Sequence, residues 1–151
     1  PVRFNADVGT LFFDKDVLRE PLPLSAPDVA KATDRIAEQY IEVLDPQQVA
    51  SQVRQLLITL LPSGKAGQDQ VAERLNRSTS TLQRQLKSEG LSYRDVLEST
   101  QRSLAETYLR DKKYSLAQVA YMLGFSEQSN FSRAFRRWTS MSPKQYRESL
   151  G

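Results

Sequence analysis

The stretch "LAQVAYMLGFSEQSNFSRAFRRW", residues 116–138, changes character at Gly124. Before the glycine, apolar residues recur at helical spacing and predict one short helix. After it, the apolar residues are spaced i, i+3, i+4 and i+7: Phe131, Ala134, Phe135 and Trp138. Glycine accepts the left-handed backbone conformation that commonly ends a helix. The stretch therefore predicts two short helices joined by a tight turn, which is the sequence form of a helix-turn-helix.

An earlier stretch repeats this pattern. "QVAERLNRSTSTLQRQLK", residues 70–87, aligns with "QVAYMLGFSEQSNFSRAFR", residues 118–136, with one extra residue in the later turn. Asn76 takes the place of Gly124, and the two serines Ser78 and Ser126 are each placed to cap the second helix of their motif. We therefore expect the same helix-turn-helix unit twice.

The second helix of each motif has a polar face opposite its apolar stripe, because successive residues are about 100° apart around a helix. The polar side chains are hydroxyls, amides and basic groups, with almost no acids after the first turn. Such groups can enter a DNA major groove, where arginine can form two hydrogen bonds to guanine. The predicted DNA-contacting residues are Ser80, Thr81, Gln83, Arg84, Lys87, Gln128, Ser129, Asn130, Ser132, Arg133, Arg136 and Arg137.

Two kinds of contact are expected within this set. The predicted readers of base edges are Ser80, Gln83, Arg84, Gln128, Ser129, Ser132 and Arg133. Lys87, Arg136 and Arg137 are expected to contact phosphates, together with backbone amides near Ser78 and Ser126. For Arg137 the alternative is a surface charge or an ion pair with Glu148.

Charge is distributed unevenly along the 151 residues. Residues 1–64 contain six Lys and Arg against nine Asp and Glu, which gives a net charge of −3. Residues 65–151 contain fifteen Lys and Arg against nine Asp and Glu, which gives a net charge of +6. The basic half is where an anionic partner would bind.

The composition argues against most enzymes. The chain has no Cys and no His, which excludes thiol nucleophiles, histidine bases and metal sites built from these ligands. The carboxylates of "DKD", residues 14–16, are typical of a solvated loop. We expect no catalytic residues, no metal and no cofactor.

The sequence also predicts where the protein is located. No apolar run approaches the roughly 18 residues that a membrane span needs, and the N-terminus lacks the pattern of a signal peptide. We therefore expect a cytoplasmic protein with no membrane partner.

The predicted organisation is all-α, with two helix-turn-helix subdomains joined by a long connecting helix. The preceding segment is short, strand-like at "VRF" and "TLFF" and helical over residues 27–44. Asp45 can cap the next helix, with Pro46 in its first turn and Gln48 completing a capping box. Residues 1–44 are expected to be the end of an effector or regulatory domain and its linker, and residues 45–151 the DNA-binding domain. Within the DNA-binding domain we expect the first helix-turn-helix over 45–91, the connecting helix over 92–110 and the second helix-turn-helix over 111–151.

The connecting helix is expected over residues 92–110, with Ser92 as its cap and no Gly or Pro inside it. At about 1.5 Å per residue, some eighteen residues would span roughly 27 Å. With the packing of each motif at its ends, this separation is close to one turn of duplex, about 34 Å.

The run "SLAQVAYMLGFSEQSNFSRAFRRWTSMSPKQYRESL", residues 115–150, closely resembles the signature of the AraC/XylS transcription regulators. Residues 65–110 resemble the first helix-turn-helix and connecting helix of that family, and residues 1–44 resemble the end of its effector-sensing N-terminal region. The resemblance implies a bacterial regulator that inserts two recognition helices into DNA. It further implies an activator that contacts RNA polymerase, and a homodimer formed through the missing part of the N-terminal region.

The sequence departs from the family pattern at two positions. Gln101 stands where the connecting helix of the family usually carries Arg, so a salt bridge or phosphate contact of the family would be absent. Ser140 stands where the family often has Gly, and we expect strain there because serine is less comfortable in the left-handed conformation.

A different class of function stays open from the sequence. The helical unit could bind a protein, such as a component of the transcription machinery, and touch DNA only weakly. The salt dependence of the affinity distinguishes DNA binding from protein binding, because DNA binding weakens steeply with added salt and a mainly apolar protein contact does not.

Overall fold

The computed structural model describes residues 48–151, and all regular structure in that range is helical. In chain order the elements are α2 (Val49–Leu60), the 3-10 helix η2 (Leu61–Ser63), α3 (Gln68–Arg74), α4 (Thr79–Ser88), α5 (Tyr93–Arg110), α6 (Leu116–Met122), α7 (Gln128–Thr139) and α8 (Pro143–Ser149). The prediction of an all-helical fold is confirmed for these residues. The strand-like runs and the helix expected over residues 27–44 lie outside them.

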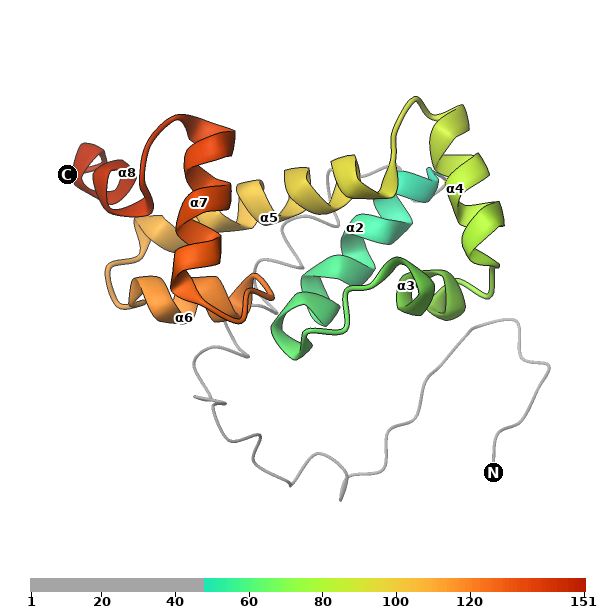
Figure 1. Cartoon of the computed structure of the whole chain (residues 1–151), viewed down its shortest axis with the longest axis horizontal. Helices are drawn as coiled ribbons and strands as arrows, with labels where there is room; N and C mark the ends of the chain where they lie inside the picture. The colour runs from blue at the N-terminus through green and yellow to red at the C-terminus, as the bar shows by residue number, and fades with distance from the viewer. Residues whose placement is uncertain (1–47) are drawn as a thin grey trace, which may run out of the picture.

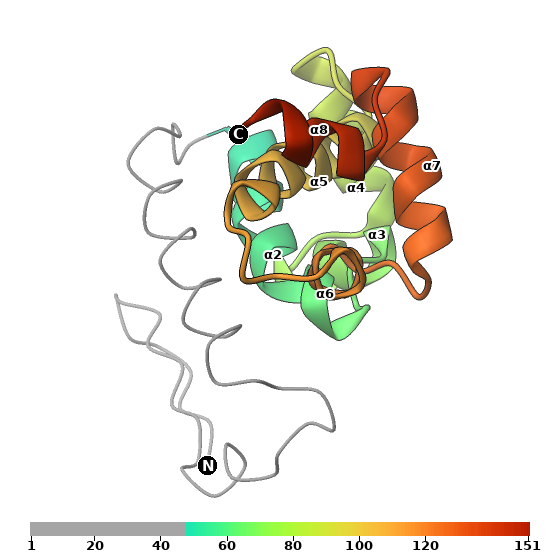
Figure 2. The same cartoon turned by 90° about the vertical axis from the view of Figure 1, so that its left-hand side faces the viewer.

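The helices are arranged around α5, which runs along the length of the molecule (Figure 1). The first motif, α3 and α4, lies at one end of α5, and the second motif, α6 and α7, lies at the other with α8 beside it. Helix α2 packs against α5, α4 and α3. The view along α5 shows α7 and α4 on the same side of the molecule (Figure 2).

One continuous hydrophobic core joins the two ends. Its side chains come from the apolar stripes of the amphipathic helices, as helical periodicity requires. Fully buried members include Val53 and Leu57 of α2, Leu82 and Leu86 of α4, Leu104 and Leu109 of α5, and Phe131 and Phe135 of α7. Because both motifs share this core, neither is an independent lobe on a flexible tether.

The predicted turns of both motifs are present. Asn76 and Gly124 have φ of 54° and 80°, in the left-handed region where asparagine and glycine are the preferred residues. Ser140 also has a positive φ of 64° and ends α7, as expected from its departure from glycine. Ser78 caps α4 by accepting a hydrogen bond of 3.1 Å from the Thr81 N–H.

The long connecting helix begins where the sequence predicts. The Ser92 hydroxyl accepts a hydrogen bond from the Asp95 N–H at 3.1 Å, and the Asp95 carboxylate accepts one from the Ser92 N–H at 2.8 Å. Bonds from the Ser92 hydroxyl and backbone hold the pKa of the Asp95 carboxyl below its ordinary value. The result is a capping box at the start of an unbroken helix of 18 residues.

Two predicted helix starts are wrong. Glu127, not Ser126, is the N-cap residue of α7, because the extra residue in the second turn moves the helix start one position along the chain. Helix α2 begins at Val49 with Gln48 as its N-cap, and Gln48 does not complete a capping box. Asp45, the expected cap, and Pro46, expected in the first turn, lie outside the described residues.

The first turn of α2 is capped by a distant carboxylate. The two carboxylate oxygens of Glu89 accept hydrogen bonds from the backbone N–H groups of Val49 at 2.7 Å and Ala50 at 2.9 Å. Glu89 is the residue that ends α4. The end of one predicted recognition helix is thereby attached to the start of α2.

Two contacts attach the turn of the second motif to the rest of the protein. The buried Gln101 side chain of α5 donates a hydrogen bond of 2.9 Å from Nε2 to the carbonyl of Leu123. A Cβ atom at Gly124 would lie 2.9 Å from the carbonyl oxygen of Leu61 in η2, so the turn packs directly on the end of the α2 segment. From the sequence, Gln101 was expected only to remove a contact that Arg makes in the family. In the structure its buried side chain bonds α5 to the turn of the second motif.

Candidate nucleic-acid interface

Helix α4 presents a polar face opposite its buried leucines. Leu82 and Leu86 are fully buried, whereas Ser80, Gln83, Arg84 and Lys87 are exposed. The Ser78 hydroxyl donates to the Thr81 hydroxyl at 2.8 Å, and Thr81 is half-buried. Of the five residues predicted to contact DNA in this motif, Thr81 is therefore the one most involved in holding the helix start.

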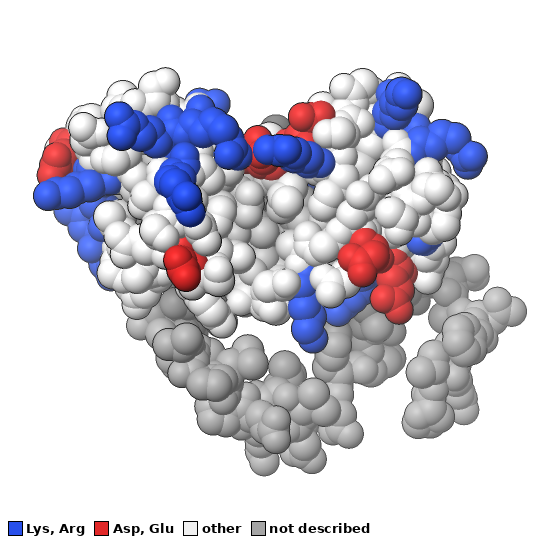
Figure 3. Space-filling view, viewed as in Figure 1, with Lys and Arg blue, Asp and Glu red and all other residues white. Residues whose placement is uncertain are grey.

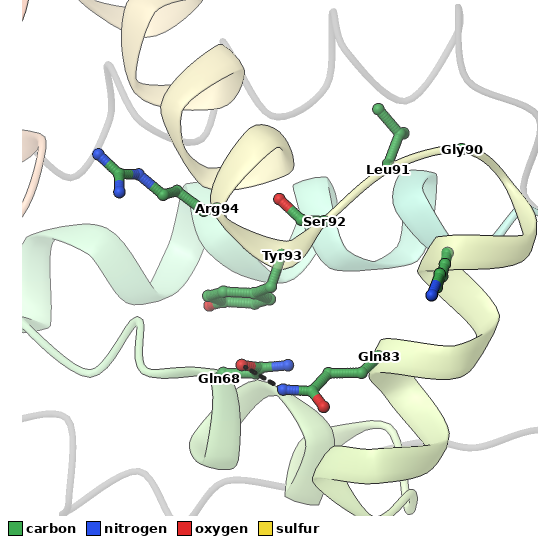
Figure 4. A pocket seen from close by; sticks show the side chains of 8 residues that line it. Gln68, Gln83, Gly90, Leu91, Ser92, Tyr93 and Arg94 are labelled. Carbon is green, nitrogen blue, oxygen red and sulfur yellow. Dashed lines mark hydrogen bonds between the residues drawn. The ribbon is translucent and has the colours of Figure 1, made fainter.

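The remaining α4 side chains differ in how firmly they are held. Gln83 donates a hydrogen bond of 3.4 Å from Nε2 to the Gln68 side-chain carbonyl of α3 (Figure 4). Neither Arg84 nor Lys87 forms a hydrogen bond or an ion pair with the part of the chain that the structure describes. These two cations can therefore turn toward an external anion.

Helix α7 has the same division into two faces. Phe131 and Phe135 are fully buried, and the aromatic rings of Phe125, Trp138 and Tyr146 pack around them. On the opposite side lie the predicted DNA-contacting residues. Gln128, Ser129, Arg133, Arg136 and Arg137 are exposed, and Asn130 and Ser132 are partly buried.

Hydrogen bonds orient two of the α7 side chains. The Arg133 Nη2 donates to the side-chain oxygen of Asn130, one turn earlier. The Ser129 hydroxyl donates to the Glu127 carboxylate at 3.1 Å. Asn130 therefore directs Arg133, and Glu127 places an acid beside Ser129 at the helix start.

Arg137 has a different ion-pair partner from the one considered from the sequence. Its Nη2 lies 2.8 Å from Oε1 of Glu98 in α5, whereas Glu148 lies 4.0 Å from the Lys144 ammonium group of its own helix. The expected alternative of a pair with Glu148 is wrong. The side of α7 that carries Arg137 faces α5, and this cannot be read from the residues of α7 alone.

The two polar helices lie at opposite ends of one face. In the space-filling view, Lys and Arg side chains gather on the upper part of two lobes that meet in a saddle (Figure 3). The lobes correspond to α7 on one side and α4 on the other (Figure 1). This placement gives one face with two basic ends.

A hollow of about 610 Å³ lies beside α4 on the side of α5. Its lining includes Gln83 and Lys87 of α4, Gln68 of α3, and Tyr93 and Arg94 of α5 (Figure 4). The Tyr93 hydroxyl donates to the Ala66 carbonyl at 2.8 Å, and burial, followed by the nearby Asp69 charge, raises the pKa of Tyr93 to about 12. Tyr93 is therefore a neutral wall of the hollow.

Arg94 is a candidate that sequence reasoning missed. It follows the cap of α5 rather than lying in a recognition helix, so it is not on the outward face of either motif. The available signal was its spacing of four residues from Glu98, which predicts an ion pair on an exposed helix face.

Within residues 48–151, no group of three or more His, Cys, Asp or Glu side chains is placed to hold a metal ion. No helix in that range has the length and the apolar character that crossing a membrane would require.

Residues 71–149, which run from within α3 to the end of α8, match the helix-turn-helix domain family. The chain belongs to the AraC-type helix-turn-helix family. Members of the AraC-type family are DNA-binding transcription regulators and not enzymes. The resemblance inferred from the "GFS" and "FSRAF" segments of the second motif is thereby confirmed.

Individual relatives agree with this assignment. The chain is 39% identical over 149 residues to the HTH-type transcriptional regulator VirS of Mycobacterium tuberculosis, a match that covers 97% of this chain and 43% of VirS. It is 37% identical over 91 residues to the urease operon transcriptional activator of Escherichia coli, covering 60% of this chain and 31% of that protein. The chain spans less than half the length of these AraC-type relatives.

A solved AraC-type structure has the same fold. The C-terminal domain of AraT, a response regulator from Geobacillus stearothermophilus, superimposes with a TM-score of 0.61 at 29% identity. The superposition covers 71% of this chain and 88% of the AraT domain.

Proposed function

We propose that this chain is the DNA-binding part of a sequence-specific transcription regulator that inserts α4 and α7 into successive major grooves of one duplex. The observation that carries the proposal is the placement of two exposed polar helices at opposite ends of the unbroken 18-residue helix α5. Eighteen residues span roughly 27 Å. With the packing of the motifs, this approaches the ~34 Å between successive major grooves on one face of DNA.

The proposed roles follow from exposure and from the partners of each side chain. Arg84 and Arg133 occupy the centres of the two outward faces and would read base edges, each able to bond guanine twice. Gln83, Gln128, Ser129 and Ser132 would supply further contacts to base edges, as would Ser80 at the start of α4. Lys87, Arg136 and Arg137 are exposed, come later in their helices than Arg84 and Arg133, and would bind phosphates.

The shared core supports a fixed relation between the two helices. Gln101 bonds to the Leu123 carbonyl, and Gly124 packs on Leu61, so the second motif is attached to both α5 and the α2 segment. A rigid pair of readers selects sites by the distance between two sequence blocks as well as by their bases.

We also infer that the whole protein activates transcription by contacting RNA polymerase, and that it forms a homodimer through a region outside the residues described. The urease operon relative is named as a transcriptional activator, which supports the first inference. Residues 1–44 would be the end of the effector domain, and residues 45–151 the DNA-binding domain divided at 91 and 110. Transcription from a promoter bearing the selected site, with and without the protein, tests activation.

Selection of bound sequences from random duplex DNA tests the main proposal. We expect two short enriched blocks whose centres lie about 10 to 11 base pairs apart. Binding to the enriched duplex should weaken steeply with added salt. A protein-interaction module would enrich no blocks and would show little dependence on salt, and that result would contradict the proposal.

A further inference from the structure

Arg94 lies between the two proposed recognition helices. On one side it lines the same hollow as Gln83 and Lys87 of α4. On the other side it is linked to Arg137 of α7 through Glu98. The close view shows the Arg94 side chain extending from the start of α5 away from Gln83 and Gln68 (Figure 4).

The link is a three-residue bridge over the surface of α5. A single oxygen, Oε1 of Glu98, accepts from Arg94 Nε at 3.0 Å and from Arg137 Nη2 at 2.8 Å. The Arg94 and Arg137 side chains are 76% and 58% exposed, and the Glu98 side chain is 31% exposed. The bridge therefore stands at the surface of the saddle between the helices.

Stability is a weak explanation for this bridge. Ion pairs between exposed side chains contribute little to the stability of a protein, because water and salt screen them. Two guanidinium groups around one carboxylate keep a net charge of +1, and the bond to Glu98 occupies only the Nε of Arg94. Its terminal nitrogens make no bond within residues 48–151, so they can donate to an external anion.

The position of Arg94 fits one part of a bound duplex. When two helices enter successive major grooves on one face, the strands bordering the minor groove between them run past the middle of the protein. Arg94 and Glu98 lie in the first two turns of α5, between α4, with which Arg94 shares the hollow, and α7, whose Arg137 pairs with Glu98. The groups on that part of DNA are phosphates, and arginine binds phosphate well.

We propose that Arg94 binds a backbone phosphate of the DNA between the two major grooves, and that Glu98 is a positioning residue that directs Arg94 and Arg137 toward the strand. The inference rests on the proposed function, because it assumes that α4 and α7 enter the same duplex. It adds a contact that carries no base preference and that lies outside both helix-turn-helix motifs.

The test compares Arg94→Ala with a matched variant on the same helix. Arg102 also forms an i, i+4 pair, with Nε 2.9 Å from Oε1 of Glu106, and its side chain is 52% exposed. No residue of α7 joins that pair among the bonds of the described residues. Arg102→Ala therefore removes the same charge and the same kind of ion pair without the link to a recognition helix.

Affinities of the 151-residue chain for its selected duplex and for an unrelated duplex would be measured over a range of salt. Losing one phosphate contact lowers the slope of log affinity against log salt by about 0.9, which is roughly five- to tenfold in affinity near 0.1 M salt. We expect Arg94→Ala to show this loss on both duplexes and Arg102→Ala to bind like the parent. Arg94→Lys should recover most of the affinity, and all three variants should melt like the parent.

Three results would overturn the inference. The first is a slope of log affinity against log salt for Arg94→Ala that equals that of the parent. The second is a loss of affinity in Arg102→Ala as large as that in Arg94→Ala. The third is a loss in Arg94→Ala confined to the selected duplex, which would indicate base reading. Failure of the proposed function looks different, because the parent chain itself would then show no salt-dependent binding to any duplex.

Discussion

Arg84 and Arg133 hold equivalent outward positions in α4 and α7, but their surroundings differ. Arg84 makes no bond within residues 48–151, whereas Arg133 is directed by the side chain of Asn130. We expect replacement of either arginine by Ala to lower specific binding by about 1–3 kcal/mol and to relax base preference in one half of the site. Selection of bound sequences with each variant measures this.

The control for these variants is Arg102→Ala, an exposed arginine of α5 outside both polar faces. It should leave base preference unchanged in both halves of the site. If Arg84→Ala or Arg133→Ala weakens binding equally on all sequences, the arginine in question contacts only phosphate, and the role of base reader assigned to it is wrong.

A comparison of alanine variants at Gly124 and Gly90 separates the effect of backbone conformation on stability from the effect of packing. Both have a positive φ, 80° and 76°, which costs an L-residue about 1–2 kcal/mol. A Cβ at Gly124 would lie 2.9 Å from the Leu61 carbonyl oxygen, whereas a Cβ at Gly90 has nothing within 4 Å. We expect Gly124→Ala to lower the free energy of unfolding by at least about 1 kcal/mol more than Gly90→Ala.

Thermal unfolding of the two glycine variants provides the measurement. The extra loss at Gly124 should be accompanied by weaker DNA binding, because the turn that carries this glycine sets the start of α7. Equal stabilities of the two variants would show that the contact with Leu61 relaxes easily and does not hold the second motif.

Helices α2 and α4 are coupled at their ends. The N-terminus of α2 has a partial positive charge and free N–H groups, and Glu89, at the end of α4, supplies the carboxylate that satisfies two of them. We expect Glu89→Ala to lower the free energy of unfolding by about 1 kcal/mol, the usual effect of losing a helix cap. Amide exchange at Val49 and Ala50 should become faster in this variant.

Glu73→Ala is the matched control for Glu89→Ala. Glu73 is an exposed acid in α3 with no hydrogen bond or ion pair among the described residues, so its loss should change stability little. Equal unfolding curves for Glu89→Ala and Glu73→Ala would mean that water replaces the carboxylate at the start of α2 without loss.

The arrangement of both motifs around α5 predicts a strict spacing rule on DNA. Adding five base pairs between the two sequence blocks turns one block by about half a helical turn, so α4 and α7 can no longer reach both major grooves from one face. We expect high-affinity binding to be lost on that duplex. Gel-shift titration of the spaced duplexes measures this.

Unchanged affinity after the five-base-pair insertion would contradict the rigid arrangement. It would mean that the motifs move relative to each other despite the shared core, the Gln101 bond to Leu123 and the contact of Gly124 with Leu61. A duplex in which one block is scrambled is the control, because it reports the affinity of a single motif.

Much of the fold and of the candidate interface follows from features that act over a few residues. The left-handed residues Asn76, Gly124 and Ser140 and the caps Ser78 and Ser92 were predictable because their hydrogen bonds close within one turn. Helical periodicity likewise separated the buried stripe of α7 from its exposed polar face. The repeat then predicted that the two recognition helices are equivalent.

Predictions from neighbouring residues were wrong or missing where a side chain bonds to a residue far along the chain or where the turn itself decides the helix start. Ser126 looked like a cap, yet the turn around it places Glu127 at the start of α7. The partner of Arg137 is Glu98, 39 residues away, and not the nearer Glu148. Arg94 was missed because only the packing of α7 across α5 brings Arg137 to the same carboxylate.

The sequence by itself determined the helices, their turns, which face of each is polar, and the family to which those patterns belong. Each of these depends on the spacing of residues within a helix or on bonds between near neighbours. Only the tertiary structure decided that Glu89 caps α2, that Gln101 holds the second motif, and that Arg94 stands between the recognition helices. These contacts join residues of different helices, and their partners are set by how the helices pack around one core, which no local pattern specifies.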